Sequence, residues 1–115
     1  MQAQHNVHAT DAQKAHIARL LLQANLAYGE SNSQTSLVQR VKARQECRGY
    51  LNEILAQAPE NSAALGLLGR VELDDGHLEK AHTLFTDSLS HDPAQPQQFT
   101  NLGYWAIRSE RPALA

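Results

Sequence analysis

The sequence predicts an all-α protein built from stacked helices, and three observations support this prediction. Apolar residues make up 42% of the chain while aromatic residues are only 5%, and Ala and Leu far outnumber Val and Ile. This composition favours packed helices over sheets. Apolar residues also recur at helical spacing along most of the chain, and their pattern repeats after about 34 residues.

Five helices are expected in chain order. Thr10 followed by Gln13 forms a capping-box pattern that starts a first helix near 11–28, and the turn-forming residues Gly29 to Ser36 then predict a loop. Helical spacing predicts a long second helix near 36–57, a third that carries Leu65 to Leu73, a fourth that carries Leu78 to Leu89, and a fifth from about Pro96 to Ser109.

Capping and breaking residues set the ends of the later helices. Asn61 or Ser62 can cap the third helix, and Gly76 lies where a left-handed residue would close it. The fourth helix must end before Asp92-Pro93, because proline disfavours helix in the residue ahead of it. Pro112 suits the first turn of a sixth helix.

An internal repeat is the most informative feature of the chain. At an offset of about 34 residues, Pro59 falls on Pro93, Leu65 on Phe99, Leu68 on Leu102, Gly69 on Gly103 and Ala81 on Ala115. The preceding half-repeat aligns in the same way, with Cys47 on Ala81 and Leu51 on Phe85. Agreement by residue type at this many positions indicates a stacked-repeat architecture.

The most complete copy of the repeat is Leu65-x-x-Leu68-Gly69, Ala81-x-x-x-Phe85 and Pro93, which resembles the tetratricopeptide repeat family. The resemblance implies antiparallel helix pairs stacked as a short right-handed α-solenoid. It divides the chain into a disordered tail at 1–10, a degenerate or capping helix pair at 11–61, a repeat at 62–95, and the first helix and start of the second helix of a truncated repeat at 96–115. We therefore expect an N-terminal fragment of a longer protein.

The repeat also predicts where helices pack closely. Gly69 and Gly103, together with the small Ala81, should allow two helices to approach, and Phe85 should fill the space between them. The first helix pair carries about ten residues more than the repeat length allows. The predicted core consists of Leu65, Leu68, Val71, Ala81, Leu84, Phe85, Leu89 and Leu102.

Composition excludes several classes of partner. Ten basic and twelve acidic residues, without long runs of one sign, give no footprint for nucleic acid. The first eleven residues lack the basic start and apolar stretch of a signal peptide, and no segment approaches the length of a membrane span. Cys47 is the single cysteine and is expected to be a buried packing residue. A cytoplasmic protein with no nucleic-acid or membrane partner is predicted.

No catalytic, cofactor or metal site is predicted. Among the six histidines, His77 and His82 lie five residues apart, which is a poor spacing for one metal on a helix face. Asp74, Asp75 and Glu79 straddle a turn, where solvated carboxylates commonly lie near a helix start. The chain is not expected to be an enzyme by itself.

The family resemblance implies a concave surface, lined by the first helix of each pair, that binds an extended or helical peptide. Carried over residue by residue, this groove comprises Ala63, Gly66, Arg70, Asp74, Gln97, Thr100, Asn101, Tyr104 and Arg108. Ala63 and Gly66 should leave room for a ligand, and the two arginines should suit a carboxylate. Family members that clamp a chaperone's C-terminal carboxylate use Lys, Arg and Asn from three repeats. Only Asn101 matches that set, so this mode of binding is not expected.

We therefore expect a protein–protein interaction module that binds a peptide or protein segment through its groove. The alternative is a regulatory or targeting N-terminal arm of a larger enzyme, such as a glycosyltransferase, with catalysis outside this chain. Phe99, Leu102, Trp105 and Ile107 recur around the fifth helix, so part of its apolar surface should stay exposed. We expect a second copy to cover it, with Trp105 or its neighbours in the contact of a homodimer.

Overall fold

A computed structural model of the chain describes residues 10–110, which form five α-helices and no strand. In chain order they are α1 (Asp11–Ser33), α2 (Leu37–Gln57), α3 (Ser62–Asp74), α4 (Leu78–His91) and α5 (Pro96–Glu110). The predicted all-α class is confirmed. Residues 1–9 of the predicted tail and the predicted start of a sixth helix at 111–115 lie outside the described residues.

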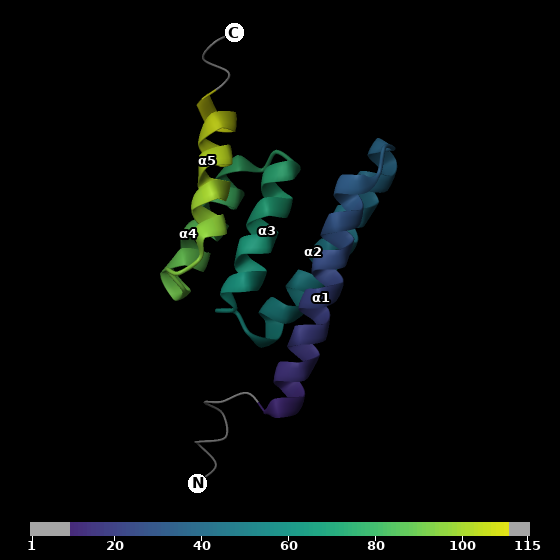
Figure 1. Cartoon of the computed structure of the whole chain (residues 1–115), viewed down its shortest axis with the longest axis vertical. Coiled ribbons are helices and arrows are strands. Elements are labelled where there is room, and N and C mark those ends of the chain that lie inside the picture. Colours follow the sequence, from purple (N-terminus) through teal and green to yellow (C-terminus); the bar gives the residue numbers. More distant parts are fainter. Residues whose placement is uncertain (1–9, 111–115) are drawn as a thin grey trace.

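Each helix packs against the helices that precede and follow it. The most extensive contacts pair α1 with α2 and α3 with α4, while α3 also contacts α1 and α2, and α5 contacts α3 and α4. Figure 1 shows α3 between the α1–α2 pair and α5. Only three or four residues connect consecutive helices, so each helix turns back along the one before it. The fold is thus a stack of helix pairs, in which α1, α3 and α5 follow one another as neighbours.

The predicted caps are present. Thr10 and Gln13 form the capping box, since the Gln13 backbone N–H donates to Thr10 Oγ1 at 3.1 Å and the Thr10 N–H donates to Gln13 Oε1 at 2.9 Å. Asn61, and not Ser62, caps α3, because its Oδ1 accepts from the Ala64 N–H at 2.9 Å. Gly76 adopts a φ of 84°, the left-handed conformation expected after this helix.

The predicted end of the first helix was wrong. α1 continues to Ser33, and the loop spans only 34–36 instead of Gly29 to Ser36. Both serine hydroxyls are satisfied inside the helix, since Ser31 Oγ donates to the Tyr28 carbonyl at 2.6 Å and Ser33 Oγ donates to the Glu30 carbonyl at 3.0 Å. Ser31 is also fully buried, and this tertiary burial outweighs the turn preference of the local sequence.

Apolar side chains form two clusters. The larger joins α1, α2 and α3 and contains Leu20, Ala24, Cys47, Leu51, Ile54, Ala64, Leu68 and Val71. The smaller joins α3 to α4 through Leu73, Ala81 and Phe85. Of the predicted core, Leu65, Leu68, Val71, Ala81 and Phe85 are buried, whereas Leu84, Leu89 and Leu102 are only partly buried. Burial raises the pKa of the Cys47 thiol to about 11, so Cys47 is an uncharged packing residue at neutral pH.

The exposed apolar surface of α5 differs in part from the prediction, because Trp105 is partly buried. Trp105 packs on α4, because its Nε1 donates to the Leu78 carbonyl at 2.8 Å and its ring centroid lies 4.5 Å from that of His82. Phe99 and Ile107 instead remain 61% and 67% exposed. Of the four residues expected on this apolar surface, Phe99 and Ile107 are therefore the ones left bare, and Trp105 attaches α5 to α4.

Hydrogen bonds among buried side chains provide much of the remaining attachment of α5. Gln98 Nε2 donates to Gln95 Oε1 at 3.5 Å, and Asn101 Nδ2 donates to Gln98 Oε1 at 3.1 Å. Gln95 Nε2 donates to the Ser88 carbonyl at 3.1 Å, and Ser88 Oγ donates to the Ser62 carbonyl at 2.7 Å. This chain of amides and hydroxyls connects α5 through α4 to the start of α3.

A cluster of ion pairs clamps α2 to the end of α3. Arg48 donates from Nε to Glu72 Oε2 at 3.1 Å and from Nη2 to Asp75 Oδ2 at 2.6 Å. Arg44 Nε donates to Asp75 Oδ1 at 2.5 Å, and His77 Nδ1 lies 2.6 Å from Glu72 Oε1. Burial acts to raise the pKa of Glu72 and of Asp75, but the hydrogen bonds from these partners outweigh it and hold both pKa values below their ordinary range.

The two repeat glycines provide a matched test of helix packing. A Cβ at Gly69 would lie 2.6 Å from both Cδ1 and Cε1 of the fully buried Phe85, whereas a Cβ at Gly103 would meet nothing within 4 Å. The predicted close approach is thus confirmed at Gly69 and absent at Gly103 among the described residues.

We expect Gly69→Ala to lower the free energy of unfolding by about 1–3 kcal/mol. Gly103→Ala should raise it by up to about 1 kcal/mol through helix propensity alone. Urea unfolding followed by circular dichroism measures both, and equal effects would show that Phe85 does not fill the space at Gly69.

The clamp makes stability depend on pH. Because the folded pKa values of Glu72 and Asp75 are lowered, the folded state binds fewer protons than the unfolded chain between the folded and the ordinary pKa values. The stabilisation is fully present above the ordinary values of 4.5 and 3.8 and is lost as pH falls through the folded values. We expect the urea midpoint to fall steeply below a pH of about 4.5.

Glu72→Gln provides the control for this pH dependence. It replaces one buried carboxylate of the clamp by a neutral side chain of the same shape, and should lower the free energy of unfolding at neutral pH by about 2 kcal/mol. Its urea midpoint should also depend less on pH below the ordinary value of 4.5 than that of the unaltered chain. Parallel pH profiles for the two proteins would contradict the assignment to Glu72.

Candidate functional site

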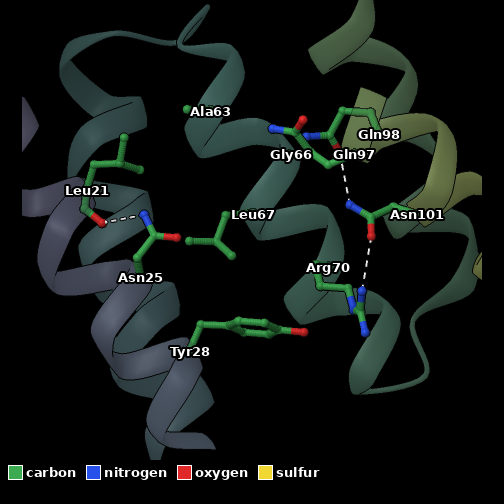
Figure 2. A pocket seen from close by; sticks show the side chains of 10 residues that line it. All are labelled: Leu21, Asn25, Tyr28, Ala63, Gly66, Leu67, Arg70, Gln97, Gln98 and Asn101. Carbon is green, nitrogen blue, oxygen red and sulfur yellow. Dashed lines mark hydrogen bonds between the residues drawn. The ribbon is translucent and has the colours of Figure 1, made fainter. Parts of the chain in front are cut away.

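α1, α3 and α5 enclose an open hollow of about 370 Å³ (Figure 2). Its floor belongs to α3, and α1 and α5 form its two walls. The lining residues are Leu21, Asn25 and Tyr28 from α1, Ala63, Gly66, Leu67 and Arg70 from α3, and Gln97, Gln98 and Asn101 from α5. We refer to this hollow as the groove.

The structure brings most of the residues predicted for the concave surface together. Ala63, Gly66, Arg70, Gln97 and Asn101 line the groove, and Asp74 and Arg108 line a second hollow that shares Arg70 with it. Thr100 and Tyr104 line neither hollow and are exposed on α5. Tyr104 still contacts the site, since Arg70 Cζ lies 5.1 Å from the centroid of its ring.

Gly66 does not leave room for a ligand, as the sequence had suggested. A Cβ at this position would lie 2.6 Å from Cδ of Gln98, a buried residue of α5. Gly66 is therefore needed so that the Gln98 amide can lie against the α3 backbone. Ala63, which is exposed, and Leu67, which is partly buried, line the same hollow on either side of Gly66 in the α3 sequence.

Arg70 occupies the centre of the concave surface and is held from two directions. Its Nη1 donates to Asn101 Oδ1 on α5 at 3.1 Å, and its Nε donates to Asp74 Oδ1 one turn further along α3 at 3.3 Å. Figure 2 shows the hydrogen-bonded chain that runs from Gln98 through Asn101 to Arg70. These contacts fix the guanidinium at the point where the two hollows meet.

The α1 wall of the groove was missed from the sequence. Tyr28 reaches across to α3, and its Oη donates to Asp74 Oδ2 at 2.7 Å. Burial, and then the hydrogen bond and negative charge of Asp74, raise the pKa of Tyr28 to about 12, so the phenol stays a donor at neutral pH. Leu21, Asn25 and Tyr28 recur at helical spacing, and that spacing could have identified the face of α1 that lines the groove.

The second hollow is smaller and strongly polar. It encloses about 290 Å³, and its lining residues are Asn32, Arg40, Arg44, Arg70, Asp74 and Arg108. We refer to it as the arginine pocket. Four different helices contribute to it, from the end of α1 to the last turns of α5.

Within residues 10–110, no three His, Cys, Asp or Glu side chains are grouped so that they could hold a metal ion. The same part of the chain contains no helix that is both long enough and apolar enough to cross a bilayer. His77 and His82 have other contacts, with Glu72 and Trp105 respectively.

Comparisons with known proteins identify no relative of the chain. No protein-family model, no curated protein and no solved structure matches the chain significantly. The resemblance to tetratricopeptide repeats therefore rests on the internal repeat, above all on Leu68, Gly69, Ala81 and Phe85. What the site can bind follows from the groove and the arginine pocket themselves.

Proposed function

We propose that the chain is a protein-interaction module of the tetratricopeptide kind, which binds a peptide or a segment of another protein along its groove. The observation that carries this proposal is the groove itself. Five residues assigned to the concave surface by the repeat pattern, Ala63, Gly66, Arg70, Gln97 and Asn101, line one open hollow between three helices. An open floor on α3 between walls from α1 and α5 suits an elongated ligand.

The lining of the groove fits the chemistry of a polypeptide. Leu21 and Leu67 provide apolar surface, while Asn25 and Gln97 bring amides that can both donate and accept. The amide of Asn25 is held by a 2.9 Å bond from Nδ2 to the Leu21 carbonyl, which leaves its Oδ1 for a backbone N–H of the ligand. A volume of about 370 Å³ accommodates a few residues of such a segment.

We also propose that a second copy of the chain covers α5. Leu65, Gly69 and Leu73 on α3 are buried, and Gly69 and Leu73 lie against side chains of α4. The positions that correspond to them in the next repeat are Phe99, Gly103 and Ile107, and all three are exposed. A stripe that is apolar in both repeats but covered in only one favours a contact with another helix.

A bulky side chain in the groove should block binding. Ala63 is exposed on the groove floor, so Ala63→Trp fills the hollow without entering the core. We expect peptides selected from a random phage-displayed library on the unaltered chain to bind this variant at least about tenfold more weakly. The matched control is Ala56→Trp, at an exposed site on α2 that lines none of the hollows. Peptides that bind both variants as tightly as the unaltered chain would place the binding surface elsewhere.

The contact between copies should depend on Ile107. We expect the chain to dimerise at tens of micromolar in sedimentation equilibrium, and Ile107→Glu to weaken the dimer at least about tenfold, because a carboxylate would be buried in the apolar contact. Val38→Glu changes an aliphatic residue on α2 that is even more exposed than Ile107, and should leave the dimer intact. A monomer at these concentrations, or equal effects of the two substitutions, would contradict the proposal.

A further inference from the structure

The tip of the first helix pair adds an end wall to the concave surface. Tyr28 and Arg44 lie level with the end of α3, since they bind Asp74 and Asp75 there. The residues between them, 29–43, therefore project past α3. The second helix pair has only residues 75–77 at the corresponding place, so this tip accounts for most of the extra length of the first pair.

The projecting tip brings positive charge to the arginine pocket. Arg40 and Asn32 belong to the tip, and they face Arg70, Asp74 and Arg108 across the pocket. The pocket thus combines residues of the repeat with residues that the repeat pattern does not contain. A segment lying in the groove reaches it directly, because Arg70 lines both hollows.

Two of the four guanidinium groups in the pocket keep an unbalanced charge. Arg44 is paired with Asp75 at 2.5 Å, and Arg70 is paired with Asp74 at 3.3 Å. Arg108 donates to the Leu73 carbonyl, which carries no charge. Arg40 forms no ion pair with any carboxylate of residues 10–110. The pocket is therefore locally positive although the whole chain carries a net charge of −2.

We infer that the arginine pocket binds the carboxylate of a Glu or Asp side chain in the segment that occupies the groove, an inference that rests on the proposed function. Guanidinium groups bind carboxylates through paired, charge-assisted hydrogen bonds. The wall also contains Asp74, whose two oxygens accept from Arg70 and from Tyr28. Asp74 therefore balances Arg70, and the guanidinium groups left to bind the ligand's carboxylate are those of Arg40 and Arg108. The proposed partner is thus an acidic protein segment.

Nuclear magnetic resonance of the ¹⁵N-labelled chain provides the test, with acetyl-tetraglutamate-amide as the probe. We expect saturable shifts of the Asn32 side-chain amide and of the Nε–H groups of Arg40 and Arg108. Arg40→Gln and Arg108→Gln should each raise the dissociation constant about tenfold. Both residues are exposed, so these variants should remain folded. Arg19→Gln removes the same charge from an exposed site on α1 outside the pocket, and should leave the dissociation constant unchanged.

Three results would overturn the inference. If Arg19→Gln weakened binding as much as the pocket variants do, the attraction would depend only on net charge. Equal affinity for acetyl-tetraglutamine-amide would show that the carboxylate has no role. Tighter binding of inorganic phosphate would show that the pocket prefers another class of ligand. The proposed function fails separately, since it depends on Ala63→Trp and the selected peptides. If those peptides require the open groove but show no acidic preference, the groove stands and the arginine pocket has no part in recognition.

Discussion

The clamp between α2 and α3 is the interaction on which the geometry of the site depends. Arg48 bridges Glu72 and Asp75, and Arg44 adds a second bond to Asp75, so two guanidinium groups hold the end of α3. α2 contacts α3 less extensively than it contacts α1, and these charged groups reinforce that contact. Because α1 is packed along α2, the same bonds fix the distance between the α1 wall and the α3 floor. The clamp therefore positions both the groove and the projecting tip beside it.

Local chemistry was sufficient to predict most of the helices from the sequence. The capping box at Thr10, the cap at Asn61 and the left-handed Gly76 each depend on residues a few positions apart, and each is present as predicted. The close approach of α3 and α4 at Gly69 was also predictable, because the internal repeat places a glycine at the same position in both copies. The repeat did not predict the packing at Gly103 correctly, since a Cβ at this glycine would meet no neighbour among the described residues.

The features that the sequence did not reveal depend on residues far apart in the chain. The length of α1 is set by the burial of Ser31, and the role of Gly66 is set by Gln98, a residue of another helix. Tyr28 and Asp74 meet across two helices, and nothing near either residue predicts their hydrogen bond. In each case the sequence pattern placed the residue on a helix, but it did not identify the side chain of another helix that the residue contacts. That information exists only once the helices are packed.

The hydrogen bonds that join α5 to α3 and α4 also determine how freely the groove can change its width. Apolar surfaces can slide past one another with gradual loss of contact, but Asn101 accepts from Arg70 on α3, and Trp105 donates to the Leu78 carbonyl on α4, in one register only. A slip of α5 by one helical turn, about 5.4 Å, would break both bonds, at a cost of about 1–3 kcal/mol for each polar group left buried without its partner. The α5 wall is thus held in register before any ligand arrives. A partner meets a preorganised surface, and association sacrifices little freedom in that wall.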